Sequence, residues 1–257
     1  MLKLQNIDKV FNRGTVNEST LFSDFNLSVS RGDFISVVGS NGSGKTTLLN
    51  IISGSTPIDG GRVLLEDKDI TALAEYKRAA RIGRVFQDPA VGTVPSMTIY
   101  ENLSVAANKG KPFGLSFALE RKKLSFFRDT VADLGLGLED KMNIPVGLLS
   151  GGQRQALSLL MSTMTPIDLL LLDEHTAALD PKTAEVIMTL TDKLVKEKKL
   201  TTIMVTHNLR YAVEYGSRLV MMHEGTAILD IDGEEKKHCD VDQLLSLFNQ
   251  ISIECGN

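Results

Sequence analysis

A glycine-rich loop between an apolar run and a helical pattern limits most strongly what this chain can fold into. The run Phe34–Val38 leads into Gly39-Ser40-Asn41-Gly42-Ser43-Gly44-Lys45-Thr46, and residues 45–53 carry a helical pattern that ends at Gly54. The loop fits GxxxxGK[ST], in which glycines let backbone N–H groups turn toward phosphate oxygens. The helix that follows adds the positive end of its dipole. The sequence therefore predicts a P-loop in a strand–loop–helix unit.

Short apolar runs alternate with helical patterns beyond this loop, which is typical of a mostly parallel α/β sheet whose strands are buried on both faces. The runs are Val63–Leu65, Ile82–Phe86, Leu169–Leu172, Ile203–Val205 and Leu219–Met222. The first thirty residues instead alternate apolar and polar, which predicts antiparallel strands joined by a turn at 12–20. We expect one domain over 1–257, with an α/β core at 1–90 and 165–235, an inserted helical subdomain at about 91–164, and a helical tail at 236–257.

Two motifs besides the P-loop contain residues suited to nucleotide binding or hydrolysis: the acidic pair after the run Leu169–Leu172, and the segment Leu149–Gln155. The apolar run that ends at Leu172 is followed by Asp173, placed to hold Mg²⁺, and Glu174, which can polarise an attacking water. Within the P-loop, Lys45 is placed to reach the β- and γ-phosphates, and the Thr46 hydroxyl to ligate Mg²⁺. Upstream, the segment Leu149–Gln155 (LSGGQRQ) opens onto a helix and offers a second anion-binding helix terminus. One nucleotide has little need of two such sites from one chain, so the second site is expected to complete the pocket of a second copy.

With the P-loop and the LSGGQ signature at Leu149–Gln153, the chain resembles the ATP-binding cassette (ABC) ATPases over about residues 2–235. In this family two cassettes face each other head to tail, and the P-loop of one and the signature of the other enclose each ATP. The resemblance implies ATP and Mg²⁺ as cofactors and a second cassette as a partner. It also implies that Ser150 and Gly152 contact the γ-phosphate bound to that second copy.

The resemblance gives roles to four further positions. Gln87 matches the Q-loop glutamine, which touches Mg²⁺ or water, and His207 matches the switch histidine, which contacts the γ-phosphate. Asp180 matches the D-loop at the dimer interface, and it is also suited to cap the helix that begins at Pro181. Phe11 lies where the family places an aromatic ring against adenine, with burial in the core as the alternative.

The site residues so implied form three overlapping sets. The catalytic residues are Lys45, Gln87, Glu174 and His207. The Mg²⁺ ligands are Thr46, Gln87 and Asp173. The nucleotide-binding residues are Phe11, Gly39, Ser40, Asn41, Gly42, Ser43, Gly44, Lys45, Thr46, Thr47, Ser150, Gly151, Gly152, Gln153 and Asp180.

No apolar run approaches the roughly 18 residues needed to cross a bilayer, and the N-terminus lacks the apolar core of a signal peptide. The chain is therefore expected to be cytoplasmic. The resemblance to ABC cassettes implies that it works on the inner face of the membrane with separate membrane-spanning permease subunits. It also implies a surface for those subunits at 88–102, with Val91, Val94, Met97, Ile99 and Tyr100 as its apolar residues. A net charge of −4 argues against an electrostatic grip on nucleic acid.

Import of a small organic solute such as an amino acid is the leading hypothesis, with a solute-binding protein as a further partner. One alternative is a cassette of an exporter or a lipoprotein-release complex. The other is a soluble ABC ATPase of the iron–sulfur assembly type, which would bind soluble scaffold proteins instead of permeases.

Overall fold

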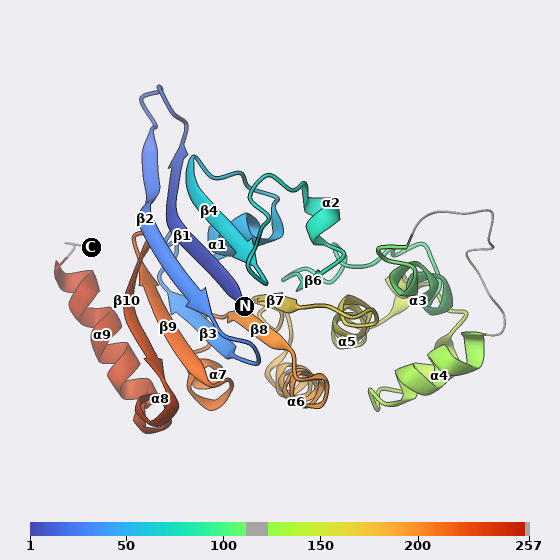
Figure 1. Cartoon of the computed structure of the whole chain (residues 1–257). Coiled ribbons are helices and arrows are strands. Elements are labelled where there is room, and N and C mark those ends of the chain that lie inside the picture. The colour runs from blue at the N-terminus through green and yellow to red at the C-terminus, as the bar shows by residue number, and fades with distance from the viewer. Residues whose placement is uncertain (112–122, 255–257) are drawn as a thin grey trace. The chain divides into compact units, whose positions relative to one another are not determined.

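Two compact units make up the computed structural model, which describes residues 1–111 and 123–254 (Figure 1). The first unit comprises Met1–Arg78 together with the chain from Leu200 onward, and the second comprises Ala79–Lys199. The second unit is therefore an insertion in the sequence of the first.

An antiparallel sheet of order β2-β1-β4-β5 forms one part of the first unit. Strand β1 pairs with β2 so that Leu2 lies opposite Val29 and Leu4 opposite Leu27, all four buried. A turn joins these two strands as predicted, but it covers 12–18 instead of 12–20, because Ser19 and Thr20 already pair with β1. The strands are β1 (Leu2–Phe11), β2 (Ser19–Val29), β4 (Gly60–Leu65) and β5 (Lys68–Asp69).

Four strands of the sheet that carries the P-loop lie in the first unit, in the order β10-β9-β3-β8. Strand β3 pairs in parallel with β8 and β9, and every residue of β3 and β8 is buried. Such complete burial explains why these strands are mostly apolar and do not alternate between apolar and polar residues. Their buried polar residues are Ser36 in β3 and Thr201 and Thr202 in β8. The strands are β3 (Phe34–Gly39), β8 (Thr201–Val205), β9 (Arg218–His223) and β10 (Thr226–Asp232).

Five helices accompany these sheets in the described part of the first unit. A buried cluster that includes Val38, Met221, Cys239 and Leu244 packs the later helices against the sheet. The helices are α1 (Lys45–Ser53), α2 (Glu75–Arg78), α7 (Leu209–Glu214), α8 (Gly233–His238) and α9 (Val241–Glu254).

A pair of parallel strands and four α-helices form the described part of the second unit. Strand β6 (Ile82–Val85) lies beside β7 (Leu169–Asp173), so that the carboxyl ends of both strands emerge at the same edge. The helices are α3 (Ile99–Ala107), α4 (Leu124–Ala132), α5 (Gly151–Ser162) and α6 (Pro181–Lys198), with short 3-10 turns at Glu139–Lys141 and Val146–Leu148.

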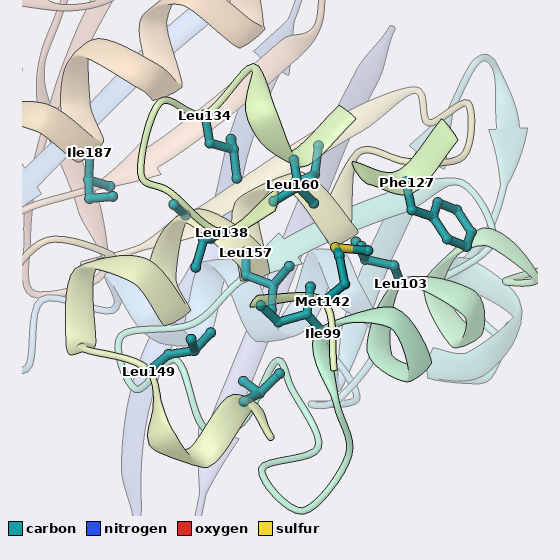
Figure 2. Packing of buried hydrophobic residues seen from close by; sticks show 13 residues of the cluster. Ile99, Leu103, Phe127, Leu134, Leu138, Met142, Leu149, Leu157, Leu160 and Ile187 are labelled. Atoms are coloured by element: carbon teal, nitrogen blue, oxygen red, sulfur yellow. The ribbon is translucent and has the colours of Figure 1, made fainter. Parts of the chain in front are cut away.

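The helices of the second unit share one apolar core. Figure 2 shows Leu103 of α3, Phe127 of α4 and Leu157 of α5 among the side chains of this cluster, all of them buried. Phe127 also packs its ring against that of Tyr100, with 6.0 Å between the ring centroids. This core holds α5, and with it the signature segment, in a fixed orientation within the unit.

The α/β fold expected from the sequence is confirmed, and each predicted apolar run lies in or overlaps a strand. The run Val63–Leu65 was wrongly assigned to the mostly parallel sheet, because β4 pairs antiparallel with β1 and only part of it is buried. The subdomain limits at 91–164 and 236–257 remain predictions. In the ranges 1–111 and 123–254, no helix is both long and apolar enough to span a bilayer.

Candidate functional site

The P-loop follows β3 directly, and two of its glycines are needed for its path. Gly39 has φ 155°, and a Cβ atom there would lie 2.2 Å from the carbonyl oxygen of Met222. Gly44 caps α1 with φ 101°, and a Cβ atom there would lie 2.9 Å from the ring of Phe22. Any other residue at either position would combine a clash with a rarely allowed backbone conformation. The glycine pattern therefore follows from backbone geometry and close packing.

Lys45 is folded back over the loop that precedes it. Its Nζ atom donates to the carbonyl oxygens of Gly39, at 2.9 Å, and Ser40, at 2.8 Å, and the whole residue is nearly buried. The ammonium group thus lies at the centre of the turn, where the loop backbone surrounds it. Thr46, in the first turn of α1, is exposed, and Thr47 is partly exposed.

His207 lies at the same sheet edge as the P-loop. Strands β3 and β8 run in parallel with Val37 opposite Val205, and the backbone N–H of Thr206 donates to the carbonyl of Val37. The chain therefore leaves β8 next to the point where it leaves β3, and the exposed His207 follows. The structure brings together these two sequence-predicted elements, the loop and the histidine.

Phe11 is the last residue of β1, and 38% of it is exposed. The Nζ atom of Lys9 lies 5.2 Å from the centre of its ring, a cation–π distance. The alternative that Phe11 is a core residue is therefore wrong, and its ring is available for stacking.

Gln87, Asp173 and Glu174 are gathered at the strand edge of the second unit. Val85 of β6 lies opposite Leu172 of β7, so the chain leaves both strands at the same level. Gln87 is exposed, whereas Asp173 is almost buried. Glu174 has φ 46°, a left-handed conformation that costs a non-glycine residue about 1–3 kcal/mol. Such strain at a strand end is frequent in functional sites.

Arg84 is a charged residue of this edge that the sequence analysis missed. Its guanidinium donates to Oδ2 of Asp173 at 2.8 Å, and both side chains are only 11% exposed. The guanidinium carbon also lies 4.6 Å from the centre of the Phe86 ring. A lone arginine inside the short strand Ile82–Val85 was the available signal, because a charge in a buried strand needs a partner.

His175 is a second residue that the sequence analysis missed, and it follows Glu174 directly. It is buried, and its Nε2 atom lies 3.1 Å from the hydroxyl oxygen of Thr191, which donates in turn to the carbonyl of Ile187. Burial lowers the pKa of His175 to about 4. The ring is therefore neutral at pH 7 and joins the strand end to α6.

The signature segment forms the capped start of α5. The Ser150 hydroxyl accepts from the Gln153 backbone N–H at 3.3 Å, and the Gln153 side chain accepts from the Ser150 N–H at 3.3 Å. This reciprocal pair is a capping box, in which two otherwise unpaired N–H groups find partners. Ser150 and Gly151 are exposed, and Gly152 is packed so tightly that a Cβ atom there would lie 2.3 Å from the Thr183 side chain. One turn further, the buried Gln155 donates its amide to the carbonyl of Phe86 at 3.2 Å.

Asp180 begins α6 as its N-cap, because its Oδ1 atom accepts from the Thr183 backbone N–H at 3.1 Å. Hydrogen bonds from Thr183 hold the pKa of Asp180 below its ordinary value. The capping role expected from the sequence is confirmed, and the exposed carboxylate leaves the D-loop role open as a prediction.

The surface expected at 88–102 contains only part of the predicted apolar set. Val91, Val94 and Met97 are exposed, by 61%, 40% and 38%. Ile99 is fully buried, and Tyr100 packs against the helical core, so both serve packing. The helical periodicity of α3 directs these two side chains inward.

The sequence profile of the ABC transporter family matches residues 22–177, more than half of the chain. This chain is a member of the ABC transporter family. A tyrosine transport ATP-binding protein of Clostridioides difficile (strain R20291) is 48% identical to the cassette over 248 residues, covering 96% of this chain and 98% of the relative. A phosphonates import ATP-binding protein of Lactococcus lactis subsp. cremoris (strain SK11) is 31% identical, covering 91% and 94%.

Solved structures of other cassettes share its fold. A cassette whose dimeric structure represents a post-hydrolysis state bound to ADP and Pi is 30% identical, with a TM-score of 0.76 over 90% of this chain and 98% of that one. A cassette in its ADP conformation is 28% identical, with a TM-score of 0.80 over 100% and 99%. Family and fold together make this chain an ATP-binding, ATP-hydrolysing cassette.

Proposed function

We propose that the cassette hydrolyses Mg·ATP within a pair of cassettes and thereby energises import of a small organic solute through separate membrane-spanning subunits. The observation that carries this proposal is the presence, on one chain, of a P-loop and of an exposed, capped LSGGQ helix start. In a symmetric pair of cassettes, the two anion-binding sites of one chain can each serve a different nucleotide. The P-loop binds the chain's own nucleotide, and the LSGGQ helix start binds the nucleotide of the second cassette.

The P-loop residues would bind the phosphates through backbone N–H groups and through Lys45. Its ammonium lies at the centre of the loop, 2.9 Å from the Gly39 carbonyl oxygen. The aromatic ring of Phe11 offers a stacking face for adenine. It lacks a hydroxyl group, and this predicts weak selectivity between adenine and guanine.

Mg²⁺ would be held by Thr46, Gln87 and Asp173, and it would neutralise charge on the phosphates. Mg²⁺ prefers oxygen ligands and is usually bound by one or two carboxylates together with substrate phosphates. Within the described ranges no group of three or more His, Cys, Asp or Glu side chains could hold a metal ion. A nearly buried Asp173 carboxylate, with the Gln87 amide at the neighbouring strand end, suits this sparse kind of ligation.

Hydrolysis would depend on Glu174 as the general base that polarises water, and on His207, which contacts the γ-phosphate. The left-handed backbone at Glu174 fixes the direction in which its side chain leaves the strand. The signature of the second cassette, with Ser150, Gly151, Gly152 and Gln153, would complete each site from the other side, next to Asp180. Electrostatic stabilisation of this kind is the main source of rate enhancement in phosphoryl transfer.

An amino acid is the proposed solute class, because the tyrosine transport relative is 48% identical over almost the whole of both chains. The exposed residues Val91, Val94 and Met97 would contact the membrane-spanning subunits. Such an assembly places the cassette on the cytoplasmic face of the membrane, and import predicts a solute-binding protein on the other side. The import relatives favour this direction over an exporter or a soluble ABC ATPase.

The test is to purify the tagged protein from detergent-solubilised membranes and to compare ATPase activity of the wild type and of Glu174→Gln. Recovery of a multi-span permease, with hydrolysis lost in the variant, is the expected result. Import would be supported by a solute-binding protein in the same complex. A purely soluble set of partners would refute the transport proposal.

A further inference from the structure

The ion pair between Arg84 and Asp173 places a cation on the carboxylate proposed to hold Mg²⁺. The guanidinium lies 2.8 Å from Oδ2 of Asp173, and both side chains are almost removed from water. The two residues come from neighbouring parallel strands: Arg84 lies opposite Leu171, two positions before Asp173. Because side chains alternate along a strand, Arg84 and Asp173 share one face of the strand pair.

Two positive groups compete for one carboxylate in such an arrangement. A hydrogen-bonded guanidinium occupies lone pairs of Asp173, and its charge repels a divalent cation that approaches the same group. When no metal is bound, the guanidinium stabilises the folded protein. It neutralises the nearly buried Asp173 carboxylate, which is followed directly by a second acidic residue, Glu174. Breaking such a pair leaves an uncompensated buried charge.

We propose that Arg84 is a positioning residue that holds Asp173 in the nucleotide-free cassette and gives it up to Mg²⁺ when Mg·nucleotide binds. The inference rests on the proposed function, since it takes Asp173 as a Mg²⁺ ligand. Arg84 thus weakens metal binding by competing with Mg²⁺ for Asp173, and it holds the Asp173 carboxylate in place when no metal is bound.

The ring of Phe86 provides the guanidinium with a second partner. Its centre lies 4.6 Å from the Arg84 guanidinium carbon, within the range of a cation–π contact. Arg84 can therefore loosen its bond to Asp173 without losing all contact. Phe86 immediately precedes Gln87, which is proposed to contact Mg²⁺. A shift of Arg84 against the Phe86 ring can therefore also displace Gln87.

The measurement is the metal dependence of nucleotide affinity in the full chain. The Kd of a fluorescent ADP analogue is determined in excess Mg²⁺ and in EDTA, and the ratio of the two reports how much the metal strengthens binding. In Arg84→Gln we expect this ratio to rise by about fivefold or more, the lower end of typical coupling between sites. Arg84→Lys keeps the charge and should hold the ratio close to that of the wild type.

Two further variants make the result specific. Arg81→Gln removes a more exposed ion pair, Arg81–Asp168 at 2.5 Å, from the other end of the same two strands, and should leave the ratio unchanged. In an Asp173→Asn background, Arg84→Gln should no longer raise the ratio, because the carboxylate for which the two cations compete is gone. Without nucleotide, Arg84→Gln should lower the urea midpoint of unfolding, and more so than it does in the Asp173→Asn background.

An unchanged ratio in Arg84→Gln, or the same increase with Asp173→Asn present, would overturn the inference while leaving the proposed function intact. A wild type whose ADP affinity does not depend on Mg²⁺ would instead contradict the proposed Mg²⁺ site itself.

Discussion

The buried imidazole of His175 makes the free energy of unfolding depend on pH in the acid range. The imidazole lies between the end of β7 and helix α6, and it is bonded through Nε2 to the Thr191 hydroxyl. Since that hydroxyl donates its own proton to Ile187, the hydrogen-bond network assigns the ring proton to Nε2. A protonated ring would be a buried cation in this position, and burial accordingly lowers the pKa of His175 from 6.5 to about 4.

The shift fixes both the sign and the size of the effect. Between pH 6.5 and pH 4 the unfolded chain binds a proton at this position and the folded protein does not, so stability falls as the pH falls through that window. The full shift corresponds to about 3 kcal/mol at the acid end, and about 2 kcal/mol of it is already lost at pH 5.

The assay is urea unfolding at pH 7.5 and at pH 5, without nucleotide and in EDTA, for the wild type and His175→Gln. Glutamine can still bond to Thr191 but does not titrate. The stability difference between the two proteins should therefore move by about 2 kcal/mol in favour of the variant on acidification. His238→Gln, at an exposed position, is the control and should follow the wild type. A difference that is the same at both pH values would refute the reasoning.

Three further substitutions test other parts of the structure. Gly39→Ala should weaken binding of a fluorescent ADP analogue by about tenfold or more, the equivalent of 1.4 kcal/mol, because its Cβ atom would lie 2.2 Å from a backbone oxygen; affinity like that of the wild type would contradict this. Phe127→Ala, in the core of the second unit, should lower the unfolding free energy by about 3–5 kcal/mol in urea titrations, and a loss below 1 kcal/mol would mean that the core refills the space. Thr98→Ala removes the N-cap of α3 and should cost about 1 kcal/mol in the same assay, while Thr98→Ser should restore most of the stability.

The P-loop and the buried strands were predictable because their signals are local. Gly39 and Gly44 each serve a backbone conformation that their own position requires, and an apolar run such as Leu169–Leu172 is a direct consequence of burial on both faces. The start of α5 was predictable for the same reason, since Ser150 and Gln153 form a capping box from neighbouring positions.

Pairings between distant residues were not predictable. Arg84 meets Asp173 only because β6 and β7 pair in one register, and a shift by one residue would turn Arg84 to the other face. His175 finds Thr191 only once α6 packs beside the strand end. The burial of Ile99 likewise depends on which face of α3 meets the core, whereas the exposed Val91 lies in the loop before that helix.

The hydrogen bond from Gln155 to the Phe86 carbonyl limits how the second unit can deform. Both groups come from elements that lead to proposed site residues, α5 to the signature and β6 to Gln87. Pulling them apart would leave the buried Gln155 amide N–H without this partner, at a cost of roughly 1–3 kcal/mol. Over a catalytic cycle the start of α5 and the end of β6 should therefore tend to move together. A displacement of one segment pulls on the other through this bond, which couples the signature to the segment that leads to Gln87.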